Sequence, residues 1–185
     1  MQAVIDACKA GRLNARPSVV ISNNGDSEAL EKAKQEGIPN YHLSSKTHPD
    51  PEKLEEEILG VLDKYRAEWI VLAGYMKKLG PKVLKKFRGR ILNVHPSLLP
   101  KYGGQGMCGE AVHAAVLAAG EKETGVTIHL VDEQYDHGKI LAQSSVPVFP
   151  DDTVESLSGR VLEQEHVFLV ETLDRIARGE IPLLE

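Results

Sequence analysis

Two polar residues, Asn93 and His95, stand two positions apart in the segment ILNVHPSLLPKYGG. Alternate side chains of a β-strand leave the same face, so this spacing would place both on one side of a strand near its carboxyl end. Ligands of open α/β sheets bind at that end, and Pro96 biases His95 toward an extended backbone. The pair could do chemistry, although a loop-capping asparagine and a hydrogen-bonded core histidine would also explain it.

A carboxylate is the third candidate. Asp136 lies in the segment EQYDHGK, which we expect to form a hairpin loop over the same end of the sheet. An amide, an imidazole and a carboxylate together could stabilise the oxyanion of a tetrahedral acyl intermediate and move a proton from nucleophile to leaving group. A carboxylate beside His95 would favour the imidazolium ion and raise the pKa of the histidine. Asp136 could equally be a turn residue, because Asp-x-Gly with Gly138 is common turn chemistry.

These side chains require a sheet to position them, and the rest of the chain has the pattern of one. Apolar and β-branched segments predict strands at Val19–Ser22, Tyr41–Leu43, Trp69–Leu72, Ile91–His95, Val126–Val131 and Ile140–Val148. Helical periodicity predicts helices at Ser27–Glu36, Pro51–Tyr65, Pro81–Phe87, Glu110–Ala119 and from Val154 to about Arg178. This alternation is typical of a doubly wound α/β domain with a mostly parallel sheet.

The last two predicted strands differ from the others. Only eight residues, 132–139, separate them. A parallel crossover needs more chain than that, so the two strands should form an antiparallel hairpin at one edge of the sheet.

Composition limits the class of protein. The 185 residues are 42% hydrophobic and 26% charged, which is typical of one soluble globular domain. A net charge of −5 argues against nucleic acid as a partner, and no apolar run approaches membrane length. Cys8 and Cys108 form no CxxC pair, so a cytoplasmic location is the simplest expectation.

The motif around His95 carries a family resemblance. ILNVHPSLLPKYGG, with VLAGYMKKLGP before it and YDHGKIL and EQEH after it, resembles the folate-dependent glycinamide ribonucleotide formyltransferases. The resemblance follows nearly the whole chain in order, and NVHPSLLPKY is highly specific for folate formyltransferases. It implies one Rossmann-type formyltransferase domain over residues 1–185, acting in purine biosynthesis as a monomer or homodimer. The implied reaction moves a formyl group from 10-formyltetrahydrofolate to the amine of glycinamide ribonucleotide, without a metal.

The resemblance also implies roles for particular residues. Asn93, His95 and Asp136 match the family's catalytic positions. The pterin of the donor would be held largely by main chain, at Met76, Lys77, Lys78, Leu79, Asn93, Asp132, Glu133, Gln134, Tyr135 and Asp136. The nucleotide would contact Gly74, Pro96 and Glu165. In the implied mechanism Asn93 and protonated His95 hold the oxyanion, while Asp136 sustains the charge on His95 and organises a water that relays the proton.

The chain also departs from the family pattern. Met1 aligns just after the family's first strand and its Gly-Ser-Asn phosphate loop, so the domain is expected to be truncated at its start. The family's first strand would lie between neighbours equivalent to Val19–Ser22 and Ile91–His95, so we expect a gap or a collapsed pairing there. A basic residue that approaches the folate tail in some members would fall on Pro51. The segment KYGGQGMCGEAVH is longer than in some members, which leaves contacts from His113 open.

Other patterns are weaker. GQGMCG, residues 104–109, matches GxGxxG, but a dinucleotide loop should follow its strand directly and this segment does not. The histidines have no zinc spacing; those weighed are His42, His48, His129, His137 and His166. His129 shares a strand face with Thr127 and could support the site or simply pack, and the acidic run Glu55–Glu57 reads as a solvated helix face.

Two rival functions stay open on the sequence alone. A related enzyme is one: a methionyl-tRNA formyltransferase would need a basic C-terminal domain, and a formyltetrahydrofolate deformylase would need an N-terminal regulatory domain. A domain that binds folate without turnover is the other.

Overall fold

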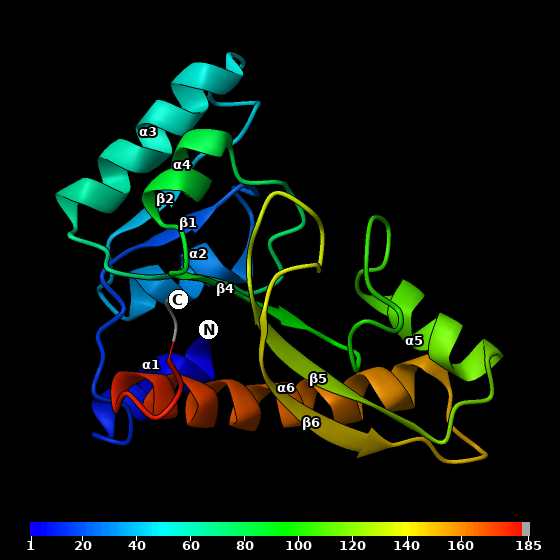
Figure 1. Ribbon diagram of the computed structural model, residues 1–185. Coiled ribbons are helices and arrows are strands. Elements are labelled where there is room, and N and C mark those ends of the chain that lie inside the picture. The colour runs from blue at the N-terminus through cyan, green and yellow to red at the C-terminus, as the bar shows by residue number, and fades with distance from the viewer. Residues whose placement is uncertain (183–185) are drawn as a thin grey trace.

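Helices and strands alternate along the chain in the computed structural model, which describes residues 1–182 (Figure 1). The strands are β1 (Val20–Ser22), β2 (Asn40–His42), β3 (Ile70–Leu72), β4 (Ile91–His95), β5 (Glu123–Leu130) and β6 (Ile140–Pro147). The helices are α1 (Gln2–Lys9), α2 (Glu28–Gln35), α3 (Pro51–Lys64), α4 (Pro81–Lys86), α5 (Glu110–Ala118) and α6 (Val154–Ala177). Every predicted element is present, and the largest shift is at β5, which begins before Val126.

The strands form two sheets. β1 pairs with β2 in parallel, and a four-stranded sheet has the order β3-β4-β5-β6. β3 and β4 are parallel, whereas β4–β5 and β5–β6 are antiparallel. The structure therefore confirms an α/β fold with an antiparallel hairpin at one edge.

The sheet is divided, but not at the place that we expected. β4 is hydrogen-bonded to β3 on one edge and to β5 on the other, so its edges are both occupied. Ile21 of β1 and Ile70 of β3 instead pack against the same hydrophobic cluster, which contains Phe87 and Ile91. The predicted gap in the sheet is present, but its predicted place between Val19–Ser22 and Ile91–His95 was wrong, because the division lies between β1 and β3.

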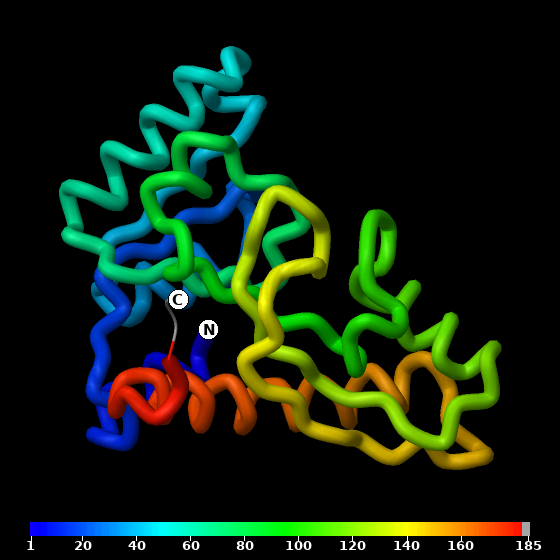
Figure 2. The backbone as a smooth tube through the Cα atoms, in the orientation of Figure 1, coloured from blue at the N-terminus to red at the C-terminus, as the bar shows by residue number. Residues whose placement is uncertain are grey.

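The main core lies between the four-stranded sheet and helix α6, which runs along one face of it (Figures 1 and 2). Val126 and Ile128 of β5 are fully buried there against Leu157 and Val161 of α6. Burial of each such side chain stabilises the fold by about 1.5–3 kcal/mol. Thr153 begins α6 with a reciprocal capping box that includes the side chain of Ser156.

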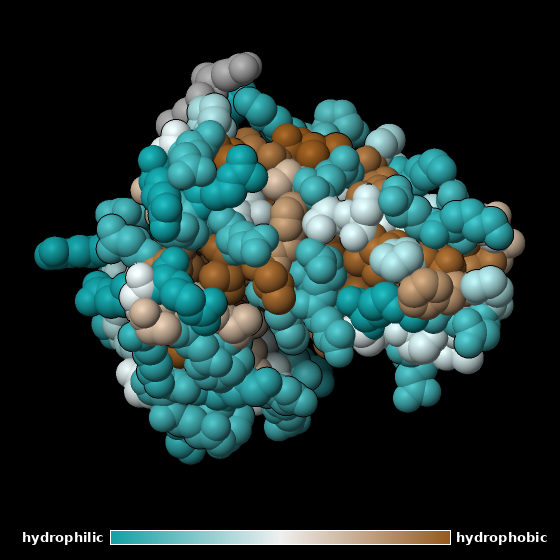
Figure 3. All heavy atoms as spheres, turned by 90° about the horizontal axis from the view of Figure 1, so that it is seen from below, coloured by the Kyte–Doolittle hydropathy of each residue, from teal (hydrophilic) through white to brown (hydrophobic). Residues whose placement is uncertain are grey.

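Alternation along β5 sends one face to this core and the other to the opposite side of the sheet. Val126 and Ile128 take the core face, so Thr127 and His129 must take the other. Seen from the side of α6, apolar atoms show between the polar ones (Figure 3), and Val167 of this helix is 55% exposed. No helix within residues 1–182 is long and apolar enough to cross a membrane.

Candidate active site

Asn93 and His95 lie on one face of β4, as the strand period predicts. Their antiparallel neighbours on β5 are His129, opposite Asn93, and Thr127, opposite His95. Directly opposite residues have Cβ atoms about 5 Å apart and share a face. Two imidazoles, one amide and one hydroxyl therefore lie next to one another on this face of the sheet, as two facing pairs.

Hydrogen bonds determine which nitrogen of each histidine is free. His95 is 3% exposed, and its Nε2–H donates to the carbonyl of Tyr102 at 2.7 Å. Its Nδ1 consequently carries the lone pair in the neutral ring. In His129 the arrangement is reversed, because Nδ1 donates to the Leu130 carbonyl at 2.9 Å and Nε2 accepts from Asn93 Nδ2 at 3.1 Å.

Asp136 brings a carboxylate to both rings. Its Oδ1 lies 3.5 Å from His95 Nδ1 and 3.6 Å from His129 Nε2. Its Oδ2 accepts the backbone N–H of Gly104 at 2.9 Å. Asp136 has a left-handed backbone, with φ 53°. Such backbone conformations cost free energy in residues other than glycine and cluster at functional sites.

Burial decides the protonation of His95. It lowers the pKa of His95 and outweighs the opposing effects of the Asp136 carboxylate and the Tyr102 carbonyl. The Asp136 carboxylate does act to raise the pKa of His95, as expected, but the expectation of a protonated His95 was wrong, because burial has the larger effect. Burial by itself raises the pKa of Asp136, but the His129 ring and the Gly104 amide bring it below its usual value. A charged Asp136 thus faces a His95 that is neutral at neutral pH.

A buried hydroxyl holds the loop that carries Tyr102 and Gly104. Thr127 Oγ1 donates to the Ser97 carbonyl at 2.6 Å and accepts the N–H of Leu99 at 3.1 Å. The amide of Gln143 on β6 donates to the Leu99 carbonyl at 2.9 Å and to Thr127 Oγ1 at 3.0 Å. The loop is therefore fixed by the two strands of the hairpin, which are also the strands that fix His129.

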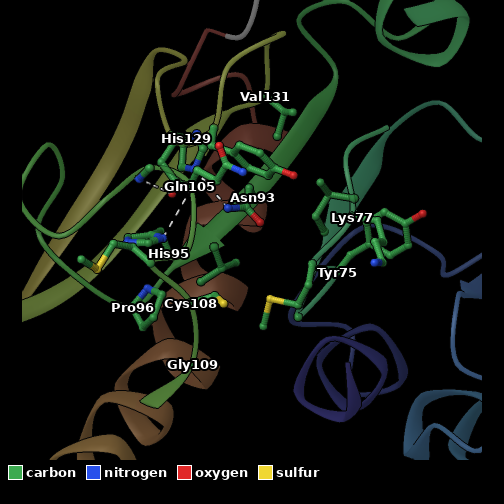
Figure 4. Close-up of a pocket in the computed structure, with 18 of the residues that line it drawn as sticks. Tyr75, Lys77, Asn93, His95, Pro96, Gln105, Cys108, Gly109, His129 and Val131 are labelled. Atoms are coloured by element: carbon green, nitrogen blue, oxygen red, sulfur yellow. Dashed lines mark hydrogen bonds and ion pairs between the residues drawn. The ribbon is translucent and has the colours of Figure 1, made fainter. Parts of the chain in front are cut away.

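The site opens into one pocket with a volume of about 550 Å³ (Figure 4). In the close-up, Asn93, His95 and His129 lie on one side, and Tyr75 and Lys77 lie across from them. Every residue that the sequence proposed for the site lines this pocket: Gly74, Met76, Lys77, Lys78, Leu79, Asn93, His95, Pro96, Asp132, Glu133, Gln134, Tyr135, Asp136 and Glu165. Glu165 comes from α6, and burial raises the pKa of its carboxyl group.

Other lining residues were missed or left undecided by the sequence. Tyr75 and Gln105 were not proposed for the site, although each lies in a motif discussed above, whereas His129 could be found from its alternation with Thr127 on β5. His113 of α5 also lines the pocket; it is 3% exposed, and its Nδ1 has no hydrogen-bond partner. Among the described residues, no group of three or more histidine, cysteine or acidic side chains could hold a metal ion.

The prediction that the acidic run Glu55–Glu57 is a solvated helix face was wrong for Glu55. Glu55 of α3 is 8% exposed rather than solvated, and its Oε1 accepts the N–H of Val83 at 2.9 Å. The N-cap residue of helix α4 is Gly80, which has no side chain to cap the helix, so Glu55 caps it from another helix. An added Cβ at Gly80 would lie 2.3 Å from the Glu55 carboxylate. This cap anchors the end of the pocket wall at Leu79.

The comparisons with known proteins agree with the motif. A family model described as Formyl transferase matches residues 1–173, and the chain belongs to this family. It is 40% identical over 177 residues to the chloroplastic phosphoribosylglycinamide formyltransferase of Arabidopsis thaliana, covering 95% of this chain and 61% of that protein. It is 42% identical over 166 residues to the phosphoribosylglycinamide formyltransferase of Haemophilus influenzae, covering 90% of this chain and 76% of the relative.

A solved structure resembles it over the full chain. Glycinamide ribonucleotide transformylase 1 from Symbiobacterium toebii superposes with a TM-score of 0.90 at 34% identity, covering 100% of this chain and 88% of that one. The chain spans 61% and 58% of the lengths of the two plant relatives, from Arabidopsis thaliana and Vigna unguiculata. The resemblance read from NVHPSLLPKY is confirmed at the level of the family.

Proposed function

We propose that this protein transfers a formyl group from 10-formyltetrahydrofolate to the amine of glycinamide ribonucleotide, as a cytoplasmic enzyme of purine biosynthesis. The observation that carries the proposal is the placement of the Asp136 carboxylate 3.5 Å from His95 Nδ1 at the floor of one pocket. A pocket of about 550 Å³ falls within the range of small-molecule sites. The names of the relatives at 40% and 42% identity support the same substrates.

The walls of the pocket suit two ligands. Segment 76–79 and loop 132–136 both line the pocket and would hold the pterin of the donor largely by main chain. Gly74, Pro96 and Glu165 line the same pocket, Glu165 from α6, and would contact the nucleotide. Both a monomer and a homodimer are compatible with this arrangement.

In the proposed reaction the substrate amine attacks the formyl carbon, and the carbonyl electron pair moves onto oxygen. Asn93 donates one N–H of its amide to His129, which leaves the second N–H for the oxyanion. His95 begins neutral and accepts the amine proton at Nδ1, because its Nε2–H is held by Tyr102. Asp136 then stabilises the imidazolium. The proton passes on to the nitrogen of the folate as the carbon–nitrogen bond breaks, which yields formylated nucleotide and tetrahydrofolate.

A direct assay tests the proposal. The protein is incubated with 10-formyltetrahydrofolate and glycinamide ribonucleotide, and both tetrahydrofolate and formylated nucleotide are quantified, with the slow variant Asp136→Asn as the comparison. Equal amounts of the two products would support formyl transfer. Formate release without the nucleotide would point to a deformylase instead. Folate binding without any turnover would favour the non-catalytic alternative.

A further inference from the structure

The pocket has two exposed walls that come from distant parts of the chain. One is segment 74–79, which follows β3, and the other is loop 132–136, which follows β5. Lys78 crosses from the first wall to the second. Its Nζ donates to the backbone carbonyl of Glu133 at 2.9 Å and lies 5.1 Å from the centre of the Tyr135 ring.

The other hydrogen bonds of loop 132–136 lie within the loop, with the adjacent His137, or with Gly104 near His95. Gln134 N–H donates to Asp132 Oδ1 at 2.8 Å, and His137 Nδ1 pairs with Asp132 Oδ2 at 2.8 Å. Asp136 is held by Gly104. Within residues 1–182, Lys78 is the side chain whose hydrogen bond joins this loop to segment 74–79.

Each wall carries one large, exposed apolar or aromatic side chain. Met76 is 54% exposed and Tyr135 is 42% exposed, and both line the pocket. Large apolar side chains that stand exposed at the rim of a pocket are suited to cover a flat ligand once it has entered. Lys78 lies over the Tyr135 ring and is two residues along the chain from Met76.

We propose that Lys78 is a latch that ties loop 132–136 to segment 74–79 and thereby slows the release of the bound folate donor. This inference rests on the proposed function of the pocket. Both contacts of the ammonium group are exposed, and a single exposed hydrogen bond or cation–π contact is weak. The contacts of Lys78 therefore break readily, and they slow the release of the donor without preventing it. Lys78 is a positioning residue, since it acts through the loop and touches no reacting atom.

The proposal predicts which substitutions keep the latch. Arginine retains a donor for the Glu133 carbonyl and stacks well on an aromatic ring, so Lys78→Arg should behave like the wild type. Methionine keeps the apolar stem but loses the donor and the charge, so Lys78→Met should open the latch. Lys82→Met is the matched control, because Lys82 pairs with Glu56 of α3 and is not among the residues that line the pocket.

Two measurements test it. Amide hydrogen exchange of the ligand-free protein should speed up in residues 132–136 by about two- to fivefold in Lys78→Met, and not in the other two variants. Stopped-flow binding of folic acid should show a similar rise in dissociation rate, and the KM for the donor should rise while kcat stays constant. Wild-type exchange rates in Lys78→Met would overturn the latch. Failure of every variant and of the wild type to bind folic acid would overturn the proposed function, while faster exchange would still support the contact.

Discussion

The Nε2–H of His95 donates to the backbone carbonyl of Tyr102 at 2.7 Å. This bond makes Nδ1 the titrating nitrogen, and Nδ1 is the atom that faces Asp136. A backbone carbonyl cannot change its protonation, so the tautomer of His95 is set by the fold rather than by pH. The position of the loop that carries Tyr102 therefore decides which nitrogen can exchange a proton with substrate.

Asp136→Asn should lower kcat by about 100-fold or more, the scale of a lost acid–base contribution, with little change in folate affinity. The amide cannot stabilise the imidazolium, so the pKa of His95 should fall further below its already lowered value. Steady-state kinetics and histidine NMR titration provide the two readouts. Asp63→Asn, which removes a carboxylate from a surface pair with Lys86, is the control and should leave both unchanged. An unaltered His95 pKa in Asp136→Asn would refute the coupling.

Stability should fall as the pH drops below about 6.5, the ordinary pKa of histidine. The folded-state pKa of His95 is lowered by burial, so the unfolded chain binds more protons between that value and 6.5. Stability therefore rises with pH through this window, and buried His113, whose pKa is also lowered, adds to the slope. Urea midpoints measured across the window should show a flatter slope for His95→Gln than for wild type. An equal slope would mean that His95 titrates alike in both states.

Glu55→Ala should reduce the free energy of unfolding by about 1–3 kcal/mol, because the buried N–H of Val83 would lose its acceptor. Glu56→Ala, next to it but exposed, should cost less than about 1 kcal/mol. Urea denaturation compares the two. Gly80→Ala should also destabilise wild type, since its Cβ would meet the Glu55 carboxylate, and should cost much less in a Glu55→Ala background. Additive losses would contradict the close contact.

Thr127→Val should destabilise the protein by about 1–3 kcal/mol, because the N–H of Leu99 would be left buried without an acceptor. The same change should loosen the loop that bears Tyr102 and alter the pH profile of kcat/KM. Thr127→Ser retains the hydroxyl and should restore the profile, with a smaller loss of stability from the missing methyl group. If Thr127→Val kept the wild-type profile, the hydroxyl would have a structural role only.

Short-range patterns in the sequence determined the elements and part of the site. The period of β4 was enough to place Asn93 and His95 on one face, because strand geometry depends only on neighbouring residues. The eight-residue connection 132–139 was too short for a crossover helix, so the β5–β6 hairpin followed from chain length. The motif NVHPSLLPKY indicated the family, which the match over residues 1–173 confirmed.

Tertiary structure decided what depends on residues far apart in the chain. His129 joined the site because β5 pairs antiparallel to β4 in the register that sets it opposite Asn93. The pKa of His95 went down rather than up because burial outweighs one nearby carboxylate, and burial is a property of the whole fold. Glu55, in an acidic run that looked solvated, became a buried cap only because α3 packs against the start of α4. Local sequence patterns cannot predict contacts of this kind, since their energies arise only when segments distant in the chain come together.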